Sequence, residues 1–349
     1  MSKVLQTFIR EILLHNRMIS DPYGRAVTSL RIQLNTVCNF KCFFCHMEGT
    51  GINSASMSLD ELESLARMAA RFGIGKIKFT GGEPTLRRDI VDIVRVTRKH
   101  IDGEISMTTN GTRLRALAGD LKDAGLDRIN ISLHSIDREG FSYITGTDSL
   151  DQVLDGIRAA QDAGLGPIKL NFVVLNGINV DQIEKMVAIS AREDIILQLI
   201  EYEVPRELEN SDDYRRYHYP LDALENNFSS ESLRTIRNSL HDRPQYYLRR
   251  EEGIARVEVV QPMRNYHFCD NCTRMRVTSA GYFKPCLMRS DNYTRFIDLL
   301  RNRKDDDSLD NAFRRSVKTR EPYWKREDTV DSQVLCEIPG SSRKGKGSN

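Results

Sequence analysis

Cysteines are the residues of this chain whose type and spacing best suit chemistry. Six of the seven form two trios, Cys38, Cys42 and Cys45 near the start and Cys269, Cys272 and Cys286 in the last third. An odd number of cysteines in a chain of 349 residues is unlike a disulfide framework and indicates metal or redox chemistry. We expect the seventh, Cys336, to be a free thiol.

Each trio is compatible with more than one metal centre. A cubane iron–sulfur cluster normally takes four cysteines, so three leave one iron without a protein ligand. An open coordination position of this kind binds a substrate or cofactor. The alternative is zinc, with His46 completing the first trio or His267 completing the second. Incidental core cysteines would be a third interpretation of the first trio.

The segments that must position these cysteines alternate between strand and helix patterns from about residue 27 to 200. A capping box at residues 58–61 and glycines at 73, 125 and 164 mark helix starts and ends. Six βα units predict a partial (β/α)6 TIM-like barrel rather than a Rossmann sheet, because no GxGxxG motif follows a strand. Short apolar runs predict the buried parallel strands at 28–34, 76–79, 104–109, 129–133, 168–175 and 195–201.

The rest of the chain has a looser pattern. We expect a C-terminal extension that closes the open side of the barrel and carries the second trio. It should contain a helix over 221–240, a strand over 255–260, a hairpin of 274–279 with 282–286, and helices near 296–303 and 308–320. The expected divisions are a helical segment over 1–26, the barrel over 27–245, a cluster-binding region over 246–325 and a disordered tail over 326–349.

Composition excludes several classes of protein. Hydrophobic residues make up 40% and charged residues 29%, which suits a soluble globular protein and excludes wholesale disorder. The net charge of +2 lacks the electrostatic footprint of a dedicated nucleic-acid binder. Apolar runs such as 195–200 fall far short of the roughly 20 residues that cross a bilayer. With no signal peptide in view, we expect a cytoplasmic protein without membrane or nucleic-acid partners.

Two motifs together resemble the radical S-adenosylmethionine enzymes. The run CNFKCFFC, residues 38–45, is similar to their cysteine signature, in which the open iron is chelated by the amino and carboxylate groups of S-adenosylmethionine. Gly81-Gly82-Glu83-Pro84, after the second strand, is similar to their second hallmark. The missing glycine side chain would let the backbone approach the bound methionine closely.

The second trio narrows the resemblance. With Thr273-Arg274-Met275-Arg276 it resembles the C-terminal cluster of the GTP 3',8-cyclases of molybdenum cofactor biosynthesis, over about residues 21–325. The resemblance implies two 4Fe-4S clusters, the second binding the guanine of GTP. It implies cofactor contacts at Phe44, Gly82 and Ser132. The implied GTP contacts are Arg31, Lys78, Thr108, Lys169, Arg274, Met275 and Arg276, with Arg31, Arg274 and Arg276 as catalytic candidates.

The residue types alone also indicate that the Arg and Lys residues among these contacts bind an anion. A triphosphate carries roughly three to four negative charges, which several Arg and Lys side chains hold best. Arg31, Lys78 and Lys169 fall in successive buried strands, where a lone Lys is usually expelled. Outward-facing ion pairs are the competing interpretation. Arg274 and Arg276 should share one face of a strand and would repel each other unless an anion or acidic partner lies between them.

The resemblance also implies a reaction and partners. One electron, from a ferredoxin- or flavodoxin-like donor, cleaves S-adenosylmethionine, and the resulting 5'-deoxyadenosyl radical takes hydrogen from C3' of GTP. The sugar radical attacks C8 of guanine, and the product, 3',8-cyclo-7,8-dihydro-GTP, passes to a cyclic pyranopterin monophosphate synthase. A monomer or homodimer is expected.

Three positions depart from the family pattern. Phe44 stands where many relatives carry Tyr, so ring packing remains without a hydroxyl. His134 replaces an acid. The family usually ends in two consecutive glycines that reach the active site, whereas here Lys346 separates Gly345 from Gly347.

Two other functions compete with GTP cyclisation. One is a peptide-modifying radical enzyme, although those usually carry more C-terminal cysteines. The other is a zinc-ribbon-like module that binds RNA through a basic face over 234–250.

Overall fold

The computed structural model describes residues 18–51, 55–238, 240–302 and 305–327. Its first part confirms the six expected strands to within two residues at each end. They are β1 (Ser29–Gln33), β2 (Lys76–Thr80), β3 (Glu104–Thr109), β4 (Arg128–Ser132), β5 (Lys169–Val174) and β6 (Ile196–Glu201). The helices between them are α2 (Leu59–Arg71), α3 (Ile90–Arg98), α4 (Leu114–Asp123), α5 (Arg138–Thr145), α6 (Leu150–Asp162) and α7 (Ile183–Arg192).

Local signals explain these helix boundaries. The Ser58 hydroxyl accepts a hydrogen bond from the Glu61 amide at 3.2 Å, and the Glu61 carboxylate accepts one from the Ser58 amide at 2.8 Å, so the capping box is confirmed. Gly125, just beyond α4, has a φ of +101°, a conformation that side chains disfavour. Four 3-10 turns accompany the helices: η1 (Met47–Gly49), η2 (Pro84–Leu86), η3 (Val180–Gln182) and η4 (Arg206–Leu208).

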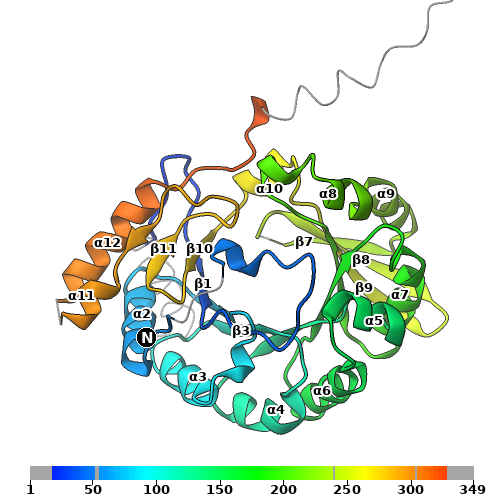
Figure 1. Cartoon of the computed structure of the whole chain (residues 1–349), viewed down its shortest axis with the longest axis horizontal. Coiled ribbons are helices and arrows are strands. Elements are labelled where there is room, and N and C mark those ends of the chain that lie inside the picture. Colours follow the sequence, from blue (N-terminus) through cyan, green and yellow to red (C-terminus); the bar gives the residue numbers. More distant parts are fainter. Residues whose placement is uncertain (1–17, 52–54, 239, 303–304, 328–349) are drawn as a thin grey trace, which may run out of the picture.

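In the described ranges, the strands join one mixed sheet of 12 strands, in the order β12-β11-β10-β1-β2-β3-β4-β5-β6-β9-β8-β7. The sheet curves, with α2, α3, α4, α6 and α7 along its outer face (Figure 1). β9 (Gly253–Val260) adds in parallel to β6, and β10 (Arg274–Val277) adds in parallel to β1. The C-terminal part therefore extends both edges of the six-stranded sheet.

The remaining elements complete these two edges. The added hairpin strands are β7 (Arg234–Asn238), β8 (Arg243–Arg250), β11 (Tyr282–Lys284) and β12 (Thr294–Arg295). The helices are α8 (Asp212–Tyr217), α9 (Asp222–Glu231), α10 (Tyr266–Asp270), α11 (Ile297–Arg301) and α12 (Asp306–Lys318). The hairpin of β10 and β11, and the helices expected near 296–303 and 308–320, are confirmed.

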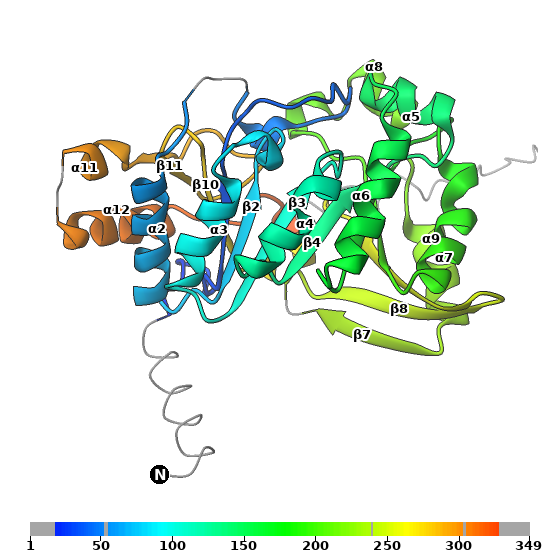
Figure 2. The same cartoon turned by 90° about the horizontal axis from the view of Figure 1, so that it is seen from below.

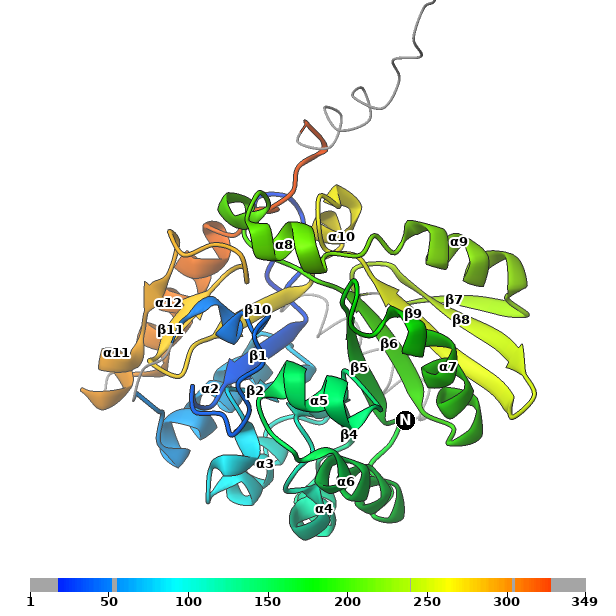
Figure 3. The same cartoon turned by 45° about the vertical axis from the view of Figure 1, so that its right-hand side comes forward.

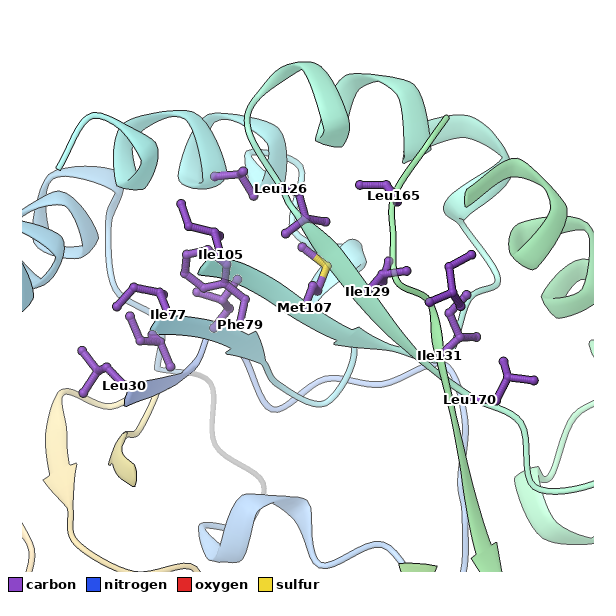
Figure 4. Packing of buried hydrophobic residues seen from close by; sticks show 14 of the residues in the cluster. Leu30, Ile77, Phe79, Ile105, Met107, Leu126, Ile129, Ile131, Leu165 and Leu170 are labelled. Carbon is purple, nitrogen blue, oxygen red and sulfur yellow. The ribbon is translucent and has the colours of Figure 1, made fainter. Parts of the chain in front are cut away.

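The main core lies between the sheet and the outer helices. Ile77, Phe79, Ile105 and Ile129 are each 1% exposed or less and point from the strands toward the helices (Figure 4). Because strand side chains alternate, Lys78, which lies between Ile77 and Phe79, faces the inner side of the curve. The apolar side chains of the strands therefore face the helices, and the polar side chains face the concave side of the sheet.

One expectation is wrong, and a second is wrong over the residues that the structure describes. The helix over 221–240 ends at Glu231, and the basic run over 234–250 forms an antiparallel ribbon, β7 and β8, against β9 (Figures 2 and 3). Long-range strand pairing and the β-formers Ile236, Tyr246 and Tyr247 outweigh the local helical pattern. Within the expected N-terminal helix, residues 18–26 form a turn closed by a bridge between Ser20 and Ala26. Residues 1–17 and 328–349, with Cys336, Gly345 and Gly347, lie outside the described residues.

In the part of the chain that the structure describes, no helix is long and apolar enough to cross a membrane.

Candidate functional site

A cavity of about 760 Å³ occupies the inner side of the curved sheet. The segment after β1, drawn in blue, lies inside this curve (Figure 1). All six cysteines of the two trios line the cavity. So do all the expected cofactor and GTP contacts except Met275, whose side chain is fully buried in the core. Residues far apart in sequence therefore meet at one site.

The first trio lies on the loop that follows β1. The Cys38 sulfur accepts a hydrogen bond from the Phe40 amide at 3.3 Å, and the Cys45 sulfur accepts one from the Met47 amide at 3.4 Å. Burial, reinforced by the neighbouring sulfurs of Cys45 and Cys38, raises the pKa of Cys42 to about 12. Such thiols ionise readily only beside compensating positive charge, which iron supplies. Within the described ranges, no three His, Cys, Asp or Glu side chains are grouped to hold a single metal ion.

Gly82 and Glu83 fasten the loop after β2 to the first cysteine loop. The Gly82 amide donates to the Asn35 carbonyl at 2.9 Å, and the Glu83 amide donates to the Val37 carbonyl at 2.7 Å. A Cβ added at Gly82 would lie 2.3 Å from the Val37 carbonyl oxygen. This close approach to the cysteine loop is by itself a reason for glycine at position 82.

The Glu83 side chain serves the architecture of the site. Its buried carboxylate accepts hydrogen bonds from the hydroxyls of Thr85 and Thr109 at 2.5 and 2.7 Å and from the Asn110 amide at 2.7 Å. Burial raises the pKa of Glu83, and these hydrogen bonds counteract part of that rise. Glu83 thus ties the ends of β2 and β3 together beside the cysteine loop.

Three cations stand side by side on the inner face. Strand register places Arg31 opposite Arg276 of β10 on one side and opposite Lys78 of β2 on the other. One carboxylate, Glu48 of η1, contacts both arginines, at 3.1 Å from Arg31 and 2.6 Å from Arg276. Burial opposes ionisation, but the two guanidiniums outweigh it and lower the pKa of Glu48 to about 2. The acidic partner expected between arginines exists, and it joins Arg31 to Arg276 rather than Arg274 to Arg276.

Other polar groups in the cavity lack partners among the described residues. Burial, with Arg128 and Arg31 nearby, lowers the pKa of Lys78 well below its usual range. Burial and neighbouring arginines do the same to the pKa of Arg274. Thr108 Oγ1 and Arg31 Nε are buried without a hydrogen-bond partner. Unpaired buried cations and an orphaned hydroxyl are costly unless a ligand satisfies them, and an anion with hydrogen-bonding groups would satisfy both.

Lys169 belongs to a second polar cluster centred on the fully buried Glu258 of β9. Glu258 forms ion pairs with Lys169 and, at 3.9 Å, with Arg243. It also accepts hydrogen bonds from Gln198 at 2.7 Å and Gln245 at 2.9 Å. Burial lowers the pKa of Lys169, and Glu258 opposes that effect. Lys169 is thus paired with a carboxylate, unlike Lys78.

The second trio is fixed by residues from both ends of the described chain. The Arg25 guanidinium donates to the Cys269 carbonyl at 2.8 Å, and Arg320 donates to the Cys272 carbonyl. Asp21 pairs with Arg25 at 2.8 Å and with Arg320 at 3.0 Å. All three side chains are buried, so this network sets the path of the second cysteine loop.

The expected cofactor side of the cavity contains Phe44, Ser132 and His134. The Phe44 ring packs edge-on against the His134 ring, with centroids 4.9 Å apart. His134 Nδ1 accepts a hydrogen bond from the Val173 amide at 3.1 Å, which places the proton of the neutral ring on Nε2. Burial lowers the pKa of His134 to about 4, so the ring is neutral at physiological pH.

Known proteins resemble this chain over nearly its whole length. The family model of the Radical SAM superfamily matches residues 32–189, and that of Molybdenum Cofactor Synthesis C matches residues 195–326. A probable GTP 3',8-cyclase of Thermoplasma volcanium is 52% identical over 320 residues, covering 91% of this chain and 97% of the relative. Its counterpart in Thermococcus kodakarensis is 46% identical over 309 residues, covering 88% and 100%. The chain belongs to the GTP 3',8-cyclase family.

Solved structures agree on the fold of this GTP 3',8-cyclase family member. Streptococcus suis SuiB bound to S-adenosylmethionine superposes with a TM-score of 0.59 at 18% identity, covering 80% of this chain. SuiB bound to its precursor peptide SuiA gives 0.58 at 17% identity, covering 81%. The chain spans 64% and 63% of those chains, less than two thirds of their length. The structure is thus an α/β radical S-adenosylmethionine fold with a mixed sheet.

Several residues that shape this family member's site carry no local sequence signal. Glu48, Glu258 and Arg243 look like ordinary charged residues in the sequence and become site residues only through strand register. Asp21 and Arg320 are nearly 300 positions apart, so no spacing rule connects them. Of these residues, only Glu48 could have been suspected from the sequence, because it closely follows a cysteine motif.

We expect Gly82→Ala to destabilise the protein by about 2 kcal/mol, because the added Cβ would overlap the backbone at Val37. The matched control is Gly119→Ala, where a Cβ meets nothing within 4 Å on an exposed position of α4. That change should stabilise the protein by about 0.5–1 kcal/mol, since alanine is the better helix former. Urea unfolding of both variants measures the difference, and equal midpoints would contradict the close-approach argument.

The free energy of unfolding should decrease as the pH is lowered, because of His134. The unfolded ring binds a proton below its ordinary pKa of 6.5, whereas the folded ring resists protonation down to about 4. Between these values the unfolded state binds more protons, so the free energy of unfolding decreases as the pH falls. We expect a His134 contribution of about 2 kcal/mol between pH 7 and pH 5. His134→Asn should remove this part of the slope in urea titrations, and identical slopes would refute the assignment.

Proposed function

We propose that this protein is a radical S-adenosylmethionine-dependent GTP 3',8-cyclase, which performs the first step of molybdopterin biosynthesis. The observation that carries the proposal is the cavity that brings two cysteine trios together with a row of partly buried cations, Arg31, Lys78 and Arg276. Curated relatives named probable GTP 3',8-cyclase, alike over almost their whole length, support it.

The residues present fit two clusters. Cys38, Cys42 and Cys45 would hold one 4Fe-4S cluster, and the trio Cys269, Cys272 and Cys286 would hold the second. In each trio the sulfurs are close enough to influence one another's pKa. We further infer that the strands form a partial (β/α)6 barrel over about 27–245, extended by a cluster-binding region over 246–325.

We assign the two ends of the cavity to different ligands. Phe44, Gly82 and Ser132 would contact S-adenosylmethionine beside the first trio. The anionic GTP would meet Arg31, Lys78, Thr108, Lys169, Arg274 and Arg276, and the buried position of Met275 leaves only its backbone for a GTP contact. The unpaired Lys78 and Arg274, and the orphaned Thr108 hydroxyl, are then satisfied by the substrate.

The chain's own part in the reaction is positioning and exclusion of water. When bound, the first cluster and S-adenosylmethionine would supply the radical that takes the hydrogen atom from C3' of GTP; the new C3'–C8 bond leaves an unpaired electron on the guanine ring, and one further electron from the donor and one proton would give the 7,8-dihydro product. Trp324, 5% exposed, lines the cavity beside Cys269, and its amide donates to the Cys269 sulfur at 3.5 Å. The Arg206 guanidinium lies over the Trp324 ring, 4.5 Å from the ring centroid.

The partners follow from the chemistry. A one-electron donor of ferredoxin or flavodoxin type would reduce the first cluster, and a cyclic pyranopterin monophosphate synthase would consume the product. The fold is shared with SuiB, whose structure holds a precursor peptide. A peptide gives no reason for Lys78 and Arg274 to lack carboxylate partners among the described residues, so GTP is the better substrate.

The test is turnover by anaerobically reconstituted protein with reductant, S-adenosylmethionine and GTP. Brown protein containing iron and sulfide, and formation of 3',8-cyclo-7,8-dihydro-GTP, are expected. Colourless protein that retains zinc and leaves GTP unchanged would overturn the proposal.

A further inference from the structure

Glu48 has no role that the family resemblance assigns to it. It lies three residues after Cys45, in η1, with a φ of +54° that is rare for a residue with a side chain. The turn is held on both sides. Glu48 reaches Arg31 and Arg276, while the Gly49 carbonyl accepts hydrogen bonds from Lys284 at 3.0 Å and Tyr293 at 2.9 Å. A strained turn kept in place by so many contacts indicates a functional constraint.

The contact geometry shows what Glu48 does to the arginines. One carboxylate oxygen contacts Arg31 and the other contacts Arg276, so each guanidinium uses a single nitrogen. The other nitrogens stay available, including the buried Arg31 Nε, which has no partner. Arg31 and Arg276 are direct neighbours across two strands, where like charges repel. Without the carboxylate between them, the two side chains would separate.

We propose that Glu48 is a positioning residue that holds Arg31 and Arg276 together so that their free nitrogens face the phosphates of GTP. This inference rests on the proposed function. It also links the phosphate-binding arginines to the first cysteine loop, because the carboxylate that spaces them belongs to the turn directly after Cys45. A competing role, in which Glu48 merely occupies the anion site until GTP displaces it, predicts the opposite effect of neutralising the carboxylate.

The experiment measures binding rather than turnover. GTP and guanosine, which has no phosphate, are titrated by anaerobic calorimetry into the reconstituted parent protein, Glu48→Gln and Glu48→Asp. Glutamine keeps the size of the side chain and removes its charge. Aspartate keeps the charge but is too short to reach both guanidiniums. The matched control is Asp310→Asn. It neutralises a carboxylate that pairs with Arg71 at 2.6 Å on the outer helices.

We expect Glu48→Gln to weaken GTP binding at least tenfold and guanosine binding less than twofold, with Glu48→Asp between the parent and Glu48→Gln. Asp310→Asn should bind GTP like the parent, and iron and sulfide contents should match throughout. GTP affinity that is unchanged or higher in Glu48→Gln would overturn the proposal, as would equal losses for GTP and guanosine. Should Glu48→Gln lose its iron, an Asp variant with parental iron and parental GTP affinity would also overturn it. A parent protein that fails to bind GTP would instead refute the proposed function itself, and this inference with it.

Discussion

Cys38→Ala should abolish reductive cleavage of S-adenosylmethionine. Cys38 belongs to the loop against which Gly82 and Glu83 pack, and a cluster already held by only three thiolates loses its fixed geometry when one is removed. No other sulfur of the described chain is placed to replace it, because the second trio sits on a separate loop held by Arg25 and Arg320. The readout is 5'-deoxyadenosine formed from S-adenosylmethionine with dithionite as reductant.

The matching change in the second trio should separate the two roles. Cys269→Ala should retain some uncoupled cleavage of S-adenosylmethionine and lose GTP cyclisation, since it leaves the first loop untouched. Parental cyclisation by Cys269→Ala would show that the second trio does not hold the substrate. Loss of cleavage in both variants would mean that the two loops fold as one unit.

The second large effect should come from Arg274. Its side chain shares the inner face of β10 with Arg276, while Met275 between them is buried in the core, as strand alternation requires. Unlike Arg276, it has no carboxylate partner among the described residues, so its guanidinium is free for a phosphate. A charge-assisted hydrogen bond contributes about 1.5–3 kcal/mol, which corresponds to roughly ten- to hundredfold in affinity.

Arg274→Lys should therefore weaken GTP binding at least about tenfold, since an ammonium cannot reproduce the planar fork of donors. Arg276→Lys should act similarly and also disturb the contact with Glu48. The control is Arg71→Lys, which changes an arginine of α2 that pairs with Asp306 and Asp310 and does not line the cavity. Anaerobic calorimetry gives the affinities, and parental binding by both Arg274→Lys and Arg276→Lys would return these arginines to a structural role.

The sequence predicts the six parallel strands well because buried strands carry their signal locally. In β2, Ile77 and Phe79 are apolar and pack in the core beneath the helices, whereas Lys78 between them is charged. The sequence of these five residues is therefore enough to predict both the strand and its unusual lysine. The capping box at Ser58 works in the same way. Such features depend on contacts within a few residues and need no knowledge of the fold.

Features that depend on distant partners are the ones that sequence patterns miss. The run after residue 231 looks helical until its pairing with β8 is known, and only β9 explains why β8 is there. Glu258 looks like an ordinary surface acid, yet register places it beside Lys169, Gln198 and Gln245. The cysteines and GTP contacts could be assigned because family motifs mark them, whereas Glu48 and Arg320 have no such mark.

The pairing of β1 with β10 has a consequence for how the protein is made. β1 emerges early in synthesis, but the strand that covers its free edge starts at Arg274, 245 positions after Ser29 (274 − 29). Until then β1 presents an unpaired backbone edge beside reactive thiols, a state prone to aggregation and oxidation. Contacts of such sequence separation also fold slowly. The last third of the chain must therefore join the sheet before this edge of β1 is covered.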